Sequence, residues 1–111
     1  MNFLLEEIDD VKILRIKEER LDSNVAPDLK AQLLMLVNDK SKVVVELSHV
    51  KYADSSGLGA LLLGLRQARD NGGHFTVCGA QKRVKSLLKI AQLDGMLKNY
   101  ENEIQAIEQM K

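Results

Sequence analysis

The fold of this chain is decided by residues 43–47, Val-Val-Val-Glu-Leu, and the hexapeptide at residues 54–59, Asp-Ser-Ser-Gly-Leu-Gly, which soon follows. The first run is β-branched and apolar at nearly every position, which is typical of a strand covered on both faces and therefore central in a sheet. The hexapeptide precedes a stretch whose apolar residues recur at helical spacing, namely Leu58, Leu61, Leu62, Leu65 and Ala68. The segment therefore predicts a central strand, a turn carrying exposed hydroxyls, and a helix.

Before this segment, two β-rich runs at residues 3–8 and 11–16 are separated by Asp9-Asp10, which predicts a hairpin. A helix is expected from the turn at Leu21-Asp22 to about Asn38, with Pro27 in its first turn, where a missing N–H is harmless. These runs supply an edge for the sheet and a first helix.

After the segment, the glycines at 72 and 73 end the second helix, and residues 75–78 form the next strand. A third helix is expected at residues 81–91 and a last one within residues 101–110. The side chains predicted to face the core are Val84, Leu87, Leu88, Ala91, Leu93, Met96 and Leu97, and Ile104 and Ile107 are predicted to share one face of the last helix. The order β-β-α-β-α-β-α-α predicts an α/β fold, a single small domain over residues 1–111 with a mixed sheet packed by about four helices.

The composition argues against several classes of protein. Sixteen basic residues balance sixteen acidic ones, whereas a dedicated nucleic-acid binder or a polybasic membrane anchor carries excess positive charge. Residues 1–7 turn acidic at once, unlike a signal peptide, and the longest apolar block, residues 57–65, is too short to span a bilayer. The single cysteine, Cys78, fits a reducing compartment, so a cytoplasmic location without membrane insertion is expected.

The hexapeptide is the candidate functional motif. A serine at a helix N-terminus can cap free N–H groups, and the helix dipole would also favour a phosphate on that serine. The same residue types are ordinary at helix starts, so taken alone such a motif is more often a cap than a regulatory site. Leu63 lies off the predicted buried stripe. It would either form a small apolar docking patch with Leu58 or Gly59 around Ser55, or be a single exposed leucine.

Other chemistries have weaker support. A hydrolase would need Ser55 or Ser56 beside His49 or His74, but the G-x-S-x-G elbow is absent. Gly57-Leu58-Gly59 lacks the third glycine of a dinucleotide fingerprint, and no P-loop follows; close packing of the helix on the domain's own sheet explains the small residues better. One cysteine and two distant histidines predict neither a metal nor a cofactor, and Cys78 is expected in the core.

The chain resembles the STAS domain family, specifically the stand-alone bacterial anti-sigma factor antagonists. The resemblance covers nearly the whole chain and is most specific at the hexapeptide after a strand. Supporting segments are the paired opening strands, Leu21-Asp22, residues 43–47, Val77-Cys78-Gly79, and Val84-Lys85-Ser86-Leu87-Leu88. The chain departs from the family at Glu19, where a glycine is usual, and at Gln92-Leu93, where Gly-Leu is common. The first departure could alter the partner surface near Asp22.

The resemblance implies a phosphorylation-controlled binding protein without enzymatic activity, acting in transcription regulation by partner switching. In the family, the serine after the aspartate, Ser55 here, is phosphorylated by the anti-sigma factor, itself a serine kinase. The unphosphorylated antagonist binds that kinase and frees a sigma factor, and a PP2C-type phosphatase restores the unmodified form. The expected partner surface, with Leu63 from the patch argument above, comprises Asp22, Asp54, Ser55, Ser56, Gly57, Leu58, Gly59 and Leu63.

A second hypothesis comes from the same family. STAS domains also occur as structural subunits of membrane transporter complexes, bound to lipid-transport ATPases or as tails of anion transporters. A purely structural subunit does not require a phosphoacceptor, so the intact Asp54-Ser55-Ser56 motif favours the switch.

Overall fold

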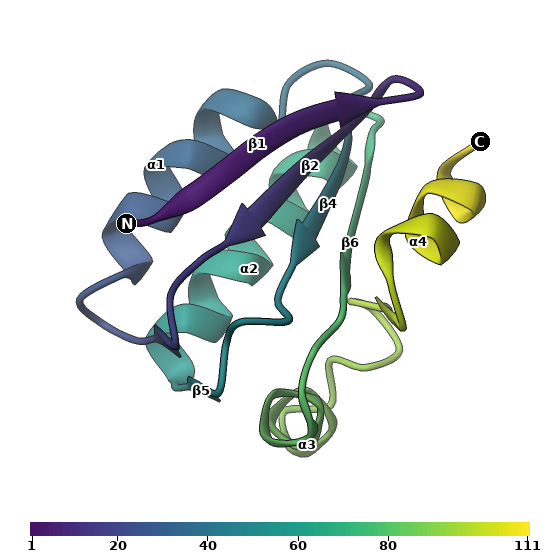
Figure 1. Cartoon of the computed structure of the whole chain (residues 1–111). Coiled ribbons are helices and arrows are strands. Elements are labelled where there is room, and N and C mark those ends of the chain that lie inside the picture. The colour runs from purple at the N-terminus through teal and green to yellow at the C-terminus, as the bar shows by residue number, and fades with distance from the viewer.

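A computed structural model describes all 111 residues (Figure 1). In chain order, the elements are β1 (Phe3–Ile8), β2 (Val11–Ile16), β3 (Arg20–Leu21), α1 (Ala26–Leu36), β4 (Lys42–Glu46), β5 (Tyr52–Ala53), α2 (Ser55–Asp70), β6 (His74–Cys78), α3 (Lys82–Ile90), β7 (Asn99–Tyr100) and α4 (Glu103–Met110). The predicted order of long elements is confirmed. The two-residue strands β3, β5 and β7 were not predicted, because two residues are too few to show a periodicity.

Five strands form a mixed sheet in the order β1-β2-β4-β6-β7. β1 and β2 are antiparallel, whereas the other neighbours pair in parallel. The predicted hairpin is confirmed: Asp9 and Asp10 form its turn with φ of 53° and 66°. Positive φ at both central residues is the requirement of the type I′ turn, whose twist matches that of the flanking strands.

Helices cover both faces of this sheet (Figure 1). α1 and α2 pack side by side on one face, α4 lies on the other, and α3 sits at one end. In the central strand β4, Val43 and Val45 belong to the larger core under α1 and α2, while Val44 belongs to the smaller core under α4. The prediction that this strand is covered on both faces is therefore confirmed.

Small residues let α2 approach the sheet closely. A Cβ built on Gly64 would lie 2.6 Å from the Phe75 ring on β6, and Ala60 is fully buried. Of the predicted stripe on α2, four residues are buried and Leu62 is half-buried against the same core. Packing on the domain's own sheet, rather than nucleotide binding, accounts for the small residues.

Two residues predicted to face the core are exposed instead, and the two isoleucines predicted to share a face of the last helix differ in burial. Ala91 lies just beyond the end of α3, and Met96 lies in the following turn, 46% exposed. Ile104 is 73% exposed because α4 turns Ala106, Ile107 and Met110 toward the sheet, and Glu103 rather than Ile104 bonds to the sheet residue Arg15. Val84, Leu88 and Leu97 are buried as predicted, and Leu87 and Leu93 are partly buried against the core.

Candidate functional site

A second, two-stranded sheet brings the starts of α1 and α2 together. β3 pairs with β5 in parallel, with Arg20 opposite Tyr52 and Leu21 opposite Ala53. Asp22 follows the first strand and Asp54 follows the second, and the Asp54 N–H donates to the Leu21 carbonyl at 3.2 Å. The two aspartates, far apart in the sequence, therefore stand at the same end of the molecule, each just before a helix.

Both aspartates hold helix starts in place. Asp54 is the N-cap of α2, in extended conformation, and its Oδ1 accepts hydrogen bonds from the N–H groups of Ser56 (2.9 Å) and Gly57 (3.1 Å). Asp22 accepts from the Asn24 N–H through Oδ1 (3.0 Å), and its carbonyl accepts from the N–H groups of the next residues, 25 and 26. The Asp54 bonds satisfy N–H groups that a helix start leaves free, whereas the Asp22 carboxylate holds the turn before α1, whose N-cap residue Val25 has no side-chain capping bond.

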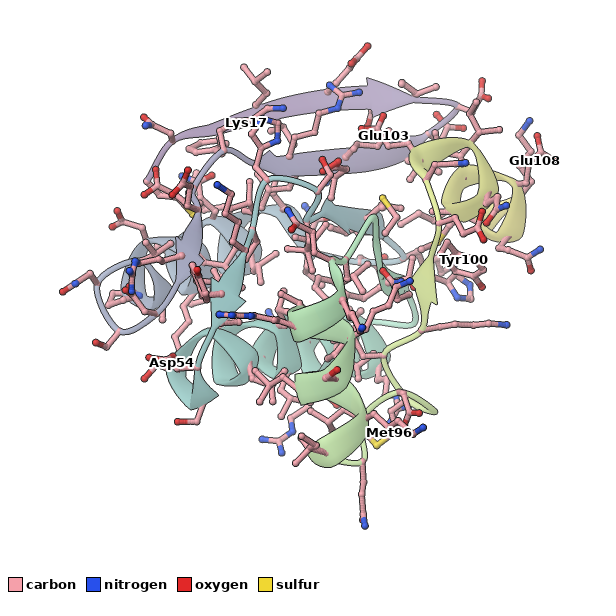
Figure 2. The ribbon with its side chains drawn as sticks, turned by 60° about the horizontal axis from the view of Figure 1, so that its bottom comes forward. Lys17, Asp54, Met96, Tyr100, Glu103 and Glu108 are labelled. Carbon is pink, nitrogen blue, oxygen red and sulfur yellow. The ribbon has the colours of Figure 1, made fainter.

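Because the Asp54 side chain caps α2, the Ser55 hydroxyl is not used as the helix cap. Ser55 is the first residue of α2, its side chain is exposed, and its hydroxyl makes no hydrogen bond within the protein. Figure 2 shows Asp54, its immediate neighbour, at the projecting tip of this helix. The expectation that a serine itself caps the helix is wrong, whereas the expected exposure of a hydroxyl at this turn is confirmed. A free hydroxyl at the positive end of a helix dipole is accessible to modification.

Beneath Ser55, the helix start is pressed against β3. A Cβ at Gly57 would overlap the Leu21 carbonyl oxygen and would lie 2.7 Å from the Leu21 Cγ. Gly59 is different, because nothing lies within 4 Å of a Cβ built there. The lack of a side chain at Gly57 therefore allows β3 to pack closely against α2, whereas Gly59 has no part in this contact.

The apolar patch expected around Ser55 does not form. Leu58 points into the core with only 8% of its surface exposed. Leu63 is half-buried and lies eight positions beyond Ser55 in α2, which is about 12 Å along a helix axis. The accessible residues at the tip are Asp54 and Ser55, with Ser56 and Gly59 half-exposed. The surface at the start of α2 is thus polar.

The structure does not assemble a catalytic serine. His49 is exposed in the turn after β4, and His74 begins β6 after the far end of α2. No hydrogen bond joins either histidine to Ser55 or Ser56. Cys78 is fully buried as predicted, and burial is the main cause that raises its pKa to about 12. The arrangement lacks the nucleophile–base contact that covalent catalysis requires.

A cationic cluster beside the hexapeptide was not predicted from the sequence. The exposed Tyr52 ring has the Arg20 and Arg83 guanidinium carbons at 5.2 Å and 4.7 Å from its centroid. Lys51 lies next to it and pairs with Glu19 at 3.3 Å. The only sequence signal was an aromatic residue next to a lysine just before the motif, because Arg20 and Arg83 come from distant positions.

The chain is similar to known proteins over nearly its whole length. The model of the STAS domain family matches residues 2–106. The anti-sigma F factor antagonist of Paenibacillus polymyxa is 27% identical over 103 residues, which cover 91% of this chain and 87% of the relative. None of the helices is both long and apolar enough to cross a membrane.

Two solved structures share the fold over almost the whole chain. A crystal structure of a proposed anti-sigma factor antagonist from Thermotoga maritima has a TM-score of 0.86 at 27% identity, covering 97% of this chain and 93% of that one. The phosphorylated form of the Bacillus cell fate determinant SpoIIAA has a TM-score of 0.75 at 17% identity, covering 99% of this chain and 100% of that one. At that lower identity the likeness concerns the fold alone.

Proposed function

The chain belongs to the STAS domain family, and we propose that it is an anti-sigma factor antagonist whose binding is switched by phosphorylation of Ser55. The observation that carries the proposal is that Ser55 is exposed and uncommitted, because Asp54 supplies the helix cap. Its partners are an anti-sigma factor with serine kinase activity and a PP2C-type phosphatase. The protein is their substrate and performs no catalysis itself.

The physical chemistry of a phosphate at this position supports a switch. Phosphorylation adds about −1.5 to −2 charges and three acceptor oxygens. In the free protein the α2 N-terminus tolerates this charge, because the helix dipole favours it. In a docked complex the same charge would lose water and face the Asp54 carboxylate. Since about 1.4 kcal/mol changes an affinity tenfold, a modest repulsion releases the partner.

The proposed docking surface follows from exposure. Asp22, Asp54, Ser55, Ser56 and Gly59 present accessible atoms at the end where α1 and α2 begin. Gly57 and Leu58 contribute from below, by fixing the helix start on β3 and on the core. Leu63 lies at the margin of this surface. Between them, the accessible residues offer hydroxyls and carboxylates rather than an apolar patch.

The test is affinity capture from the source cell with wild type, Ser55→Asp and Gln109→Glu, read by mass spectrometry. Gln109 is exposed on α4, on another part of the molecule, so the last variant controls for an added negative charge. We expect wild type and Gln109→Glu to capture a serine-kinase-like protein, and Ser55→Asp to lose it. Purified kinase should then phosphorylate wild type and leave Ser55→Ala unmodified.

Two results would contradict the proposal. A transport ATPase retained equally by all three proteins would identify a structural subunit, with Ser55 only starting a helix. Covalent labelling of Ser55 or Ser56 by a serine-reactive phosphonate would identify a hydrolase.

A further inference from the structure

Tyr52, Arg20 and Arg83 form a cluster that we call the guanidinium clamp. Tyr52 is 41% exposed on β5, Arg20 comes from β3, and Arg83 comes from the first turn of α3. Both guanidinium groups lie within cation–π distance of the ring, at 5.2 Å and 4.7 Å. Three separate elements therefore converge to hold two cations over one aromatic side chain.

Neither arginine of the clamp has an anionic partner within the molecule. The ion pairs of the protein involve the N-terminus, Arg15, Lys51 and Lys111, but not Arg20 or Arg83. The chain holds sixteen acidic residues, so carboxylates are not scarce. Two like charges gathered on one ring without a counter-ion repel each other, and an anion from outside would relieve that repulsion.

The clamp opens beside a hollow suited to an oxyanion. Lys51, Tyr52, Gln81, Lys82 and Arg83 line this hollow. The Gln81 amide donates to the Ser48 carbonyl at 2.7 Å, which ties this wall to the turn after β4. A guanidinium presents a planar fork of donors that matches a carboxylate in two parallel hydrogen bonds, and stacking on a ring holds the fork ready.

We propose that the guanidinium clamp receives a single carboxylate side chain from the partner that docks over Ser55. The proposal rests on the function proposed above and adds a second anchor to it. Tyr52 stands two residues before Asp54 on β5, and Arg20 stands two residues before Asp22 on β3. The clamp thus adjoins the proposed docking surface, and a single partner can cover both.

Charge complementarity favours a protein segment over an extended polyanion. Glu19, Asp22 and Asp54 flank the clamp on the same end of the molecule and are at least partly exposed. A nucleic-acid backbone or an anionic membrane would bring negative charge against these residues too. A single Asp or Glu on a partner reaches the hollow without that repulsion, and the polar tip around Ser55 then contacts uncharged atoms.

The first test uses the whole protein and a short peptide that carries a single glutamate among uncharged residues. We expect the peptide to shift the ¹H–¹⁵N NMR signals of Tyr52 and of the Arg20 and Arg83 side chains. In the double variant Arg20→Gln/Arg83→Gln the Tyr52 signal should no longer shift, and in Arg66→Gln/Arg69→Gln, which replaces two exposed arginines of α2, it should shift as in wild type. Shifts that persist in the clamp variant would overturn the proposal. So would shifts given by inorganic phosphate or phosphatidylserine vesicles and not by the peptide.

The second test uses the purified partner obtained by capture with the wild type. We expect each of Arg20→Gln and Arg83→Gln to weaken binding about tenfold and to flatten its salt dependence, since one charge-assisted hydrogen-bonded contact is lost. Arg66→Gln should bind as wild type. If Ser55→Asp abolishes binding while both clamp variants bind fully, only the clamp is refuted. If Ser55→Asp binds as wild type, the switch fails, and the peptide titration still decides the clamp.

Discussion

Two ends of this molecule use arginine in opposite ways. On the α4 side, Arg15 of β2 bonds Glu103 at 2.6 and 2.8 Å and Glu6 at 2.7 Å, which joins α4 to two strands. At the end that carries Ser55, called here the α2 N-terminal end, Arg20 and Arg83 stack on Tyr52 with no carboxylate partner. Figure 2 shows Glu103 and Asp54 well apart, at these two ends. Arg15 therefore joins elements of the fold, whereas Arg20 and Arg83 have no carboxylate partner within the chain.

The pKa shifts of Arg15 and Glu103 agree with this contrast. The hydrogen bond from Arg15 lowers the pKa of Glu103 below its ordinary value, against the opposing effect of burial. The same carboxylate is the main cause that raises the pKa of Arg15. The pair is therefore coupled to folding, whereas the open arginines are free to couple to a partner.

The largest effect on stability should come from forcing β3 away from the start of α2. Gly57→Ala places a Cβ against the Leu21 carbonyl, so β3 and α2 must separate, and we expect a loss of about 3 kcal/mol in the free energy of unfolding. Gly59→Ala meets open space and should instead stabilise by about 0.5–1 kcal/mol, since alanine is the better helix former. Urea denaturation of both variants measures the difference, and equal stability of the two would contradict the packing described for Gly57.

The next effect separates the two kinds of arginine. Arg15→Gln breaks a partly buried ion pair with Glu103 and an exposed one with Glu6, and we expect a loss of about 2 kcal/mol. Arg20→Gln removes an exposed, unpaired charge and should change stability by less than about 0.5 kcal/mol. The comparison is reversed for binding, where only Arg20→Gln should weaken the partner complex. Equal destabilisation by both variants would erase the distinction between the two ends.

Removal of a helix cap should have a smaller effect on stability, and the effect should be similar for α2 and α4. Asp54→Ala and Asn102→Ala each remove a side chain that accepts from a helix N–H, so each should cost about 1 kcal/mol in the free energy of unfolding. Asp54→Asn retains an acceptor and should cost little. A large loss in Asp54→Asn would mean that the charge of Asp54, rather than its capping bond, holds the start of α2.

The stability of the protein should depend on pH through the ion pair between Glu103 and Arg15. Because the folded-state pKa of Glu103 is lowered, its contribution is present above the ordinary value of 4.5 and is lost as pH falls through the folded-state pKa. Thermal unfolding of wild type and Glu103→Gln should therefore differ by a constant amount above about pH 5 and converge at lower pH. A gap that stays constant down to the most acidic pH tested would show that Arg15 does not recognise the ionised form.

The smallest effect on stability should come from the residue with the largest effect on binding. Ser55→Ala and Ser55→Asp alter an exposed hydroxyl with no internal partner, so we expect changes below about 0.5 kcal/mol. Calorimetry checks this directly. A sharp drop in the melting temperature of Ser55→Asp would make Ser55 a structural residue, and loss of partner binding would then no longer indicate a switch.

The sequence predicted the long elements well, because each has its own periodicity or turn chemistry. The β-branched run at 43–47, the Asp-Asp hairpin turn and the apolar stripe of α2 all signal their structure locally. The last helix was predicted less well: Ile104 and Ile107 were placed on one face, but only Ile107 is buried, and α4 directs Glu103 to Arg15. An ion pair between residues 15 and 103 leaves no trace in the local pattern of either segment.

By itself, the sequence determined the strand–turn–helix at the centre of the fold and the presence of a serine at the start of α2. Tertiary structure alone decided that β3 packs against Gly57 and that Arg20 and Arg83 meet on Tyr52. The physical reason is the range of the interactions. Helix and strand periodicity acts between near neighbours, whereas a two-residue strand pair and a stacked arginine form only after distant segments have packed together.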